Sequence, residues 1–151
     1  SGQYFTPAPV AEMMARMSVA HTLRPPSTMA QARTSARRLW RTMKPDTRTG
    51  ISQAGIMRGL KSLGIHASMR RNLTFGEIRR LVDGGYPVIT AVRTRTPDVH
   101  HWTVIHGYSV NPGRIYLSNT LLVRGLAQAQ HWPEFRRKVW ADPGYGIVCR
   151  R

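Results

Sequence analysis

The sequence is poor in acidic residues and has a single cysteine. Lysine and arginine number 23 against 7 aspartates and glutamates, which gives a net charge of +16 over 151 residues. One cysteine, Cys149, excludes an internal disulfide framework and a cysteine-based metal site. The six histidines include no His-x-x-x-His pair with a carboxylate, so we expect no zinc site and no cofactor.

Long hydrophobic runs are also missing. No apolar stretch approaches the roughly 18 residues that cross a bilayer, and the N-terminus lacks the pattern of a signal peptide. We therefore expect a protein that is cytoplasmic, or that is secreted or delivered as part of a larger effector. The chain begins at Ser1-Gly2 without methionine, so we expect it to be a fragment of a longer protein. Its length and its hydrophobic content of 41% predict one globular domain, 1–151.

Arginine supplies most of the positive charge, with 20 of the 23 basic residues. The guanidinium group pairs with carboxylate or phosphate in a bidentate manner, so the charge attracts polyanions or acidic proteins. A basic segment at 28–43 and the pairs 70–71 and 79–80 leave nucleic-acid binding open, although no nucleic-acid motif accompanies them. The same composition also fits a solvated basic surface without a specific partner.

Hydrophobic periodicity predicts helices in the first half of the chain and strands in the second. The predicted helices span 8–20, 28–43, 53–63, a segment between a capping box at 74–77 and Gly84-Gly85, and 132–140. The predicted strands span 65–68, 87–92, 102–108, 115–117 and 145–150, with 121–130 as either strand or loop. Helices followed by an antiparallel sheet indicate the α+β class.

A predicted β-hairpin organises the second half of the chain. Segments 102–108 and 115–117 are rich in β-branched and aromatic residues, and Asn-Pro-Gly at 111–113 favours a turn between them. Antiparallel pairing would bring His101, at the start of the first strand, toward Asn119, at the end of the second. A histidine oriented by a carboxamide is the second half of a Cys-His-Asn nucleophilic site.

The motifs along the chain resemble those of the papain-like peptidases, most closely the peptidases that process double-glycine leaders of bacteriocins. The matching features, in chain order, are Gln3, Ala11 and Met13, Leu60 with Leu63-Gly64, Gly85-Tyr86-Pro87-Val88-Ile89, His101-Trp102-Thr103-Val104-Ile105-His106-Gly107-Tyr108, Asn119, Phe135 and Trp140. The resemblance covers nearly the whole chain. It implies a papain-like fold, with N-terminal helices packed on a C-terminal antiparallel sheet, and a cysteine hydrolase or acyl-transfer activity of the peptidase or Gln/Asn deamidase type.

The nucleophilic cysteine of that family is absent. Its position, five residues after Gln3 and three before Ala11, falls on Ala8. One explanation is a deliberate Cys-to-Ala change that disarms the protein, and the other is a natural pseudoenzyme that binds a peptide or protein. We favour the first explanation, because catalysis would no longer require a pseudoenzyme to keep Gln3, His101 and Asn119 together.

The resemblance also implies a role for each site residue. A thiol at position 8 would be acidified by the helix dipole and by a nearby imidazolium. His101 would act as general base and then as general acid, Asn119 would hold its tautomer, and the amide of Gln3 would donate to the oxyanion. With Ala8 in place the chain is expected to be inactive.

The implied partners are a protein or peptide substrate and, if the domain is the toxin module of a bacterial effector, an acidic immunity or inhibitor protein that complements the charge. Simpler interpretations of the same residues stay open at this stage. His101 could be a strand histidine without a task, Asn119 a turn residue, and Gln3 a surface residue near the terminus. We expect His106 to be structural. Cys149 follows the histidine and asparagine in the chain, the wrong order for this family, and is expected to be a small buried strand residue.

Overall fold

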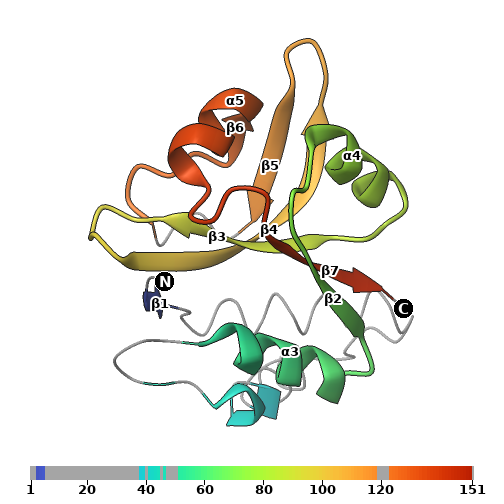
Figure 1. Ribbon diagram of the computed structural model, residues 1–151, viewed down its shortest axis with the longest axis vertical. Helices are drawn as coiled ribbons and strands as arrows, with labels where there is room; N and C mark the ends of the chain where they lie inside the picture. The colour runs from blue at the N-terminus through green and yellow to red at the C-terminus, as the bar shows by residue number, and fades with distance from the viewer. Residues whose placement is uncertain are drawn as a thin grey trace, which may run out of the picture. The chain divides into compact units, whose positions relative to one another are not determined.

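The computed structural model describes residues 3–5, 38–39, 41–44, 46, 51–118 and 123–150, with only the backbone of 3–5 (Figure 1). The chain divides into two compact units, one of Ser1–Gln3 with Ser68–Cys149 and one of Tyr4–Ala67 with Arg150–Arg151. Each unit is described on its own below. The helix predicted at 8–20 and most of that at 28–43 lie outside the described residues, but the predicted end of the second is confirmed, because 41–43 are helical.

The helix α3 (Gln53–Ser62) of the Tyr4–Ala67 unit begins and ends close to the predicted positions. The hydroxyl of Ser52 accepts the backbone N–H of Gly55 at 3.1 Å, which satisfies a donor that the first turn leaves free. Beyond the helix, Gly64 takes φ +73°, a conformation that glycine adopts without steric cost. The apolar side of α3 is buried as predicted at Ile56 and Leu60, whereas Leu63 is only half-buried.

Two glycines let the helical segment that ends at Met43 approach α3 closely. A Cβ added to Gly55 would stand 2.5 Å from the carbonyl oxygen of Met43, and one on Gly59 would stand 2.7 Å from its Cγ. The guanidinium of Arg58 donates to the same carbonyl at 3.1 Å and so satisfies an acceptor at the end of that helical segment. The core of this unit consists of Leu39, Met43, Ile51, Ile56, Leu60 and Ile65.

The described strands form one sheet in the order β2-β7-β3-β4-β5-β6, and β1 also pairs with β4. Their bounds are β1 (Gln3–Phe5), β2 (His66–Arg70), β3 (Val88–Arg93), β4 (Val99–Ser109), β5 (Arg114–Ser118), β6 (Ala129–His131) and β7 (Gly146–Arg150). The pairings of β3 with β4 and β7, of β4 with β5 and of β5 with β6 are antiparallel. The α+β class is therefore confirmed, while its finer assignment as papain-like stays a prediction.

The predicted hairpin is confirmed as β4 and β5. Ser109 pairs with Arg114 next to the turn, and Val104 pairs with Ser118 at the far end. The register shifts between Ile105 and Gly107, a bulge that frees one residue from the alternation of the strand. That residue is His106, which is exposed.

The helix predicted from the capping box is also confirmed, as α4 (Phe75–Asp83). The hydroxyl of Thr74 accepts the backbone N–H of Glu77 at 3.2 Å, the first half of that motif. The segment predicted as one helix at 132–140 is helical but irregular. It starts as α5 (Trp132–Glu134) and continues as the π-helix η1 (Phe135–Val139), in which the N–H of Trp140 reaches the carbonyl of Phe135, five residues back, at 2.8 Å.

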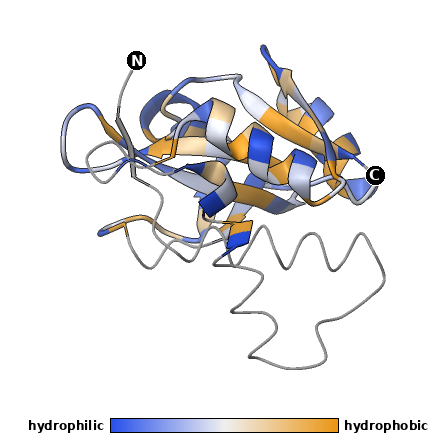
Figure 2. Ribbon diagram, turned by 90° about the horizontal axis from the view of Figure 1, so that it is seen from below, coloured by the Kyte–Doolittle hydropathy of each residue, from blue (hydrophilic) through white to orange (hydrophobic). Residues whose placement is uncertain are grey.

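One hydrophobic cluster joins the helices to the sheet in the Ser68–Cys149 unit. It consists of Leu73, Ile78, Val88, Val92, Ile105, Ile115, Leu117, Phe135, Trp140 and Val148. Ile78 belongs to α4 and Phe135 to η1, while Leu73 and Trp140 lie just outside these helices. The other members come from four strands, so the helices cover the face of the sheet to which these strand residues point. Figure 2 shows the same pattern, with hydrophobic colour along the strands and hydrophilic colour at turns and ends.

Candidate functional site

Of the predicted site residues, the structure describes His101 and the backbone of Gln3, and strand β4 connects the two. His101 lies on β4 and is only 3% exposed. The backbone of Gln3, which belongs to the same unit, lies in β1, and β1 pairs with β4. Ala8 and Asn119 lie outside the described residues. Described β5 ends at Ser118, the residue before Asn119, opposite Val104 of β4.

The register of β3 and β4 determines the face on which each histidine lies. His101 stands opposite Val92, and His100 stands opposite Arg93. Successive strand residues alternate between faces, so the two histidines are on opposite faces, as the sequence predicts. Val92 belongs to the hydrophobic cluster and also bridges to Trp140. The face of His101 is therefore the one that the helices cover.

A buried polar network lies on the same face. The hydroxyl of Thr90 donates to the carbonyl of Tyr145 at 2.8 Å. The indole N–H of Trp140 donates to the hydroxyl of Thr90 and to the carbonyl of Tyr145. Thr103, which stands opposite Thr90, donates its hydroxyl to the carbonyl of Ser118 and so ties the end of β5 to β4. Sequence reasoning missed this network, whose only signal was a threonine in each of the two predicted strands.

The environment of His100 favours its neutral form. Its pKa is lowered, mainly because the ring is partly buried and next because the charge of Arg93 opposes protonation. Asp98 acts in the opposite direction but does not outweigh these two effects.

Cys149 is fully buried on β7, as predicted for a small strand residue. Burial raises the pKa of its thiol from 9.0 to about 12, because the charged thiolate would lose its hydration. The thiolate is the nucleophilic form, so the geometry and the pKa both argue against a catalytic role for this cysteine.

We expect Cys149 to resist alkylation in the folded protein. At pH 8 the thiolate population is about 1000-fold smaller with a pKa of about 12 than with 9.0, before the blocked access is counted. The measurement is mass spectrometry after iodoacetamide treatment, with the protein unfolded in guanidinium chloride as the reactive control. Equal rates in the folded and unfolded protein would contradict this prediction.

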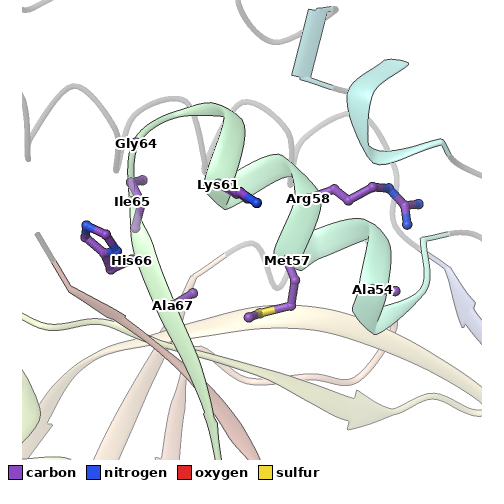
Figure 3. Close-up of a pocket in the computed structure, with 8 residues that line it drawn as sticks. All are labelled: Ala54, Met57, Arg58, Lys61, Gly64, Ile65, His66 and Ala67. Carbon is purple, nitrogen blue, oxygen red and sulfur yellow. The ribbon is translucent and has the colours of Figure 1, made fainter.

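The Tyr4–Ala67 unit contains a hollow of about 540 Å³ between α3 and the start of β2 (Figure 3). Its lining includes the apolar side chains Met57 and Ile65 and the basic residues Arg58 and Lys61. His101 is not among its described lining residues. Because Arg58 already donates to the carbonyl of Met43, the hollow has one fewer available cation than its lining suggests.

Within residues 38–46, 51–118 and 123–150, as far as they are described, no three His, Cys, Asp or Glu side chains lie close enough to hold a metal ion. In the same part of the chain no helix is long and apolar enough to cross a membrane. No protein family model matches the chain, and neither a curated protein nor a solved structure matches it at a significant level. The resemblance to papain-like peptidases therefore rests on the sequence motifs alone.

Proposed function

We propose that this chain is a papain-like cysteine hydrolase or acyl-transfer domain in which Ala8 occupies the position of the nucleophile. The observation that best supports the proposal concerns strand β4. Three parts of the motif that are distant in the sequence lie on this strand or on strands that pair with it. His101 lies on it, the strand that contains Gln3 pairs with it, and β5, which leads into Asn119, pairs with it from Val104 onward. Positions separated by nearly the whole chain thus belong to neighbouring strands.

The burial of His101 is compatible with the proposed role. A general base has to be within hydrogen-bond reach of the proton that it accepts, and shielding from water strengthens its interaction with an ionised partner. The bond between Thr103 and the carbonyl of Ser118 holds the end of β5 against β4 two residues from His101. Such a bond would help the carboxamide of Asn119 to approach the imidazole in a fixed orientation.

In the active form a thiol at position 8 would transfer its proton to His101 and attack an amide carbonyl. The side-chain amide of Gln3 and a backbone N–H would stabilise the oxyanion, and the imidazolium would then protonate the leaving amine. Release of the acyl group by water would give hydrolysis of a peptide bond or, if the attacked amide belongs to a Gln or Asn side chain, deamidation. Release by another amine would give transamidation. With alanine at position 8 no atom attacks, and the chain can only bind.

We further propose that the domain is a toxin module of a bacterial effector and that an acidic immunity protein neutralises it. The net charge of +16 supports an acidic partner, since opposite potentials steer association and suppress wrong partners. Expression of an Ala8→Cys chain in bacteria should then inhibit growth, whereas the chain as given should not.

The test of the enzymatic proposal is Ala8→Cys in the full chain. We expect hydrolysis of unfolded casein, or release of ammonia from its Gln and Asn side chains, at least about 10³-fold faster than with Ala8. Iodoacetamide should abolish the gain. The proposal fails if neither product forms and mass spectrometry detects no acyl-enzyme on the new thiol.

A further inference from the structure

An arginine of α4 contacts two aromatic rings, one from its own helix and one from the sheet. Phe75 and Arg79 are one turn apart on α4 and therefore share a side of the helix. The guanidinium carbon Cζ of Arg79 lies 5.8 Å from the centroid of the Phe75 ring. It lies 5.3 Å from the centroid of Tyr108, which belongs to β4. Both distances are within the range of cation–π attraction, so the two rings orient the guanidinium.

The two rings belong to a larger aromatic group that extends to α5. The rings of Phe75 and Tyr108 meet edge to face with centroids 6.4 Å apart, and the ring of Trp132 lies 5.2 Å from that of Phe75. All three residues are only partly buried, whereas Phe135 is fully buried in the core. Part of each of the three residues is therefore accessible to a ligand. Phe75, Arg79, Tyr108 and Trp132 are called the aromatic–arginine patch below.

Neighbouring elements fix the rings of the patch in place. The hydroxyl of Tyr108 donates to the carboxylate of Asp83, on α4, at 2.7 Å. A Cβ added to Gly113, in the turn of the β4–β5 hairpin, would stand 3.0 Å from the ring of Phe75. The carbonyl of Gly113 accepts the backbone N–H of Trp132 at 3.0 Å. These contacts join α4, α5 and the hairpin, so a ligand would meet rings that are already ordered, which lowers the entropy lost on binding.

The charge of Arg79 is not neutralised within the part of the chain that the structure describes. The residue is exposed, and no described carboxylate forms an ion pair with it. Both carboxylates of α4 have other partners. Glu77 pairs with Arg70 at 3.0 Å, and Asp83 accepts the hydroxyl of the tyrosine of the patch. The N–H groups of the Arg79 guanidinium can therefore donate to the anionic groups of a ligand.

We infer that the aromatic–arginine patch binds single-stranded nucleic acid. Unpaired bases stack on aromatic rings and on guanidinium planes, and the N–H groups of arginine donate to phosphate oxygens. The patch supplies both kinds of contact from one ordered surface, and the net charge of +16 adds attraction to a polyanion. An acidic polypeptide would use the cation alone, whereas partly exposed rings beside the cation favour a ligand with aromatic faces. Such binding would be independent of the reaction proposed above.

The chain as given can be used for the test, because binding requires no nucleophile at position 8. The probes are a fluorescent oligothymidine of about fifteen nucleotides, an abasic oligonucleotide of the same length, and a peptide of Ala, Gly and several Glu residues. Fluorescence anisotropy should show about tenfold tighter binding of oligothymidine than of the abasic strand, because only oligothymidine has bases that can stack. Arg79→Gln should weaken the binding of oligothymidine about tenfold, since it removes a phosphate donor and a stacking surface together.

Arg80→Gln is the matched control for charge. Arg80 is the next residue of α4, is exposed, and forms neither an ion pair nor a cation–π contact within the described residues. Its replacement removes the same charge from the same helix and should weaken the binding of oligothymidine by less than about threefold.

Two variants of Tyr108 test the contribution of the ring. Tyr108→Leu removes the stacking surface and should weaken the binding of oligothymidine about tenfold. Tyr108→Phe keeps the ring and loses only the hydrogen bond to Asp83, so its affinity for oligothymidine should stay within about twofold of the original chain.

Equal losses for Arg79→Gln and Arg80→Gln would overturn the inference, because charge alone would then explain the binding. So would equal affinities for oligothymidine and the abasic strand, or a tighter binding of the Glu peptide that depends on Arg79. Circular dichroism establishes that each variant is folded. Arg79→Gln changes an exposed residue, so it keeps the test decisive if Tyr108→Leu does not fold.

Discussion

Replacing His101 with alanine in a chain that carries Ala8→Cys should lower the rate of amide hydrolysis at least about 10³-fold. Without the imidazole the thiol keeps its proton at neutral pH, and the leaving amine receives no proton. The rate that is left would come from the oxyanion donors and from substrate binding alone. The measurement is kcat/KM on casein-derived peptides, together with the pH dependence of iodoacetamide alkylation of the new thiol.

The two other histidines of β4 provide the controls. His100 lies on the opposite face and His106 is exposed at the bulge, so their replacement by alanine should change kcat/KM by less than about fivefold. The alkylation profile separates a catalytic role of His101 from a structural one, because loss of the imidazolium as an ion-pair partner would raise the pKa of the thiol. An unchanged profile in a folded His101→Ala variant would disprove the assignment.

Replacement of Trp140 by alanine is expected to cost about 3–5 kcal/mol in the free energy of unfolding. The side chain is fully buried, its ring stacks on Phe135 at a centroid distance of 5.1 Å, and its indole N–H serves both Thr90 and Tyr145. A domain is stable by only about 5–15 kcal/mol, so this variant would be close to unfolding. Urea denaturation followed by circular dichroism gives the value directly.

Two matched variants divide that loss into its causes. Trp140→Phe keeps an aromatic ring but leaves two buried acceptors without their donor, and we expect a cost of about 1–3 kcal/mol. Trp132→Ala also removes an indole ring, but Trp132 is only partly buried where its ring contacts that of Trp140. Its cost in the free energy of unfolding should therefore be smaller than that of Trp140→Ala. Equal costs for the two alanine variants would mean that the polar network contributes little.

The elements that sequence reasoning placed correctly are those with local signals. Ser52 and Thr74 mark helix starts because their hydroxyls accept the N–H groups that a first turn leaves free. The hairpin follows from two runs of β-branched and aromatic residues on either side of an Asn-Pro-Gly turn. In each case the residues that determine the structure lie within roughly fifteen positions of one another.

The features that sequence reasoning missed depend on distant contacts. The π-helix η1 is followed directly by Trp140, which bridges to Val92 and donates to Thr90. No residue type within 135–139 indicates these contacts. The pairing of β1 with β4 joins residues about a hundred positions apart, and three residues of β1 are too few for periodicity to detect.

The close approach of Met43 to α3 restricts the residue types that can occupy certain positions of this chain. Positions 55 and 59 admit no Cβ without displacing Met43, position 64 needs a positive φ, and position 52 needs a capping side chain. Distant relatives with the same helix packing should therefore carry Ser, Thr, Asp or Asn, then glycine at offsets of three, seven and twelve residues. Such a pattern can identify relatives whose overall sequence identity is too low for an ordinary comparison to detect.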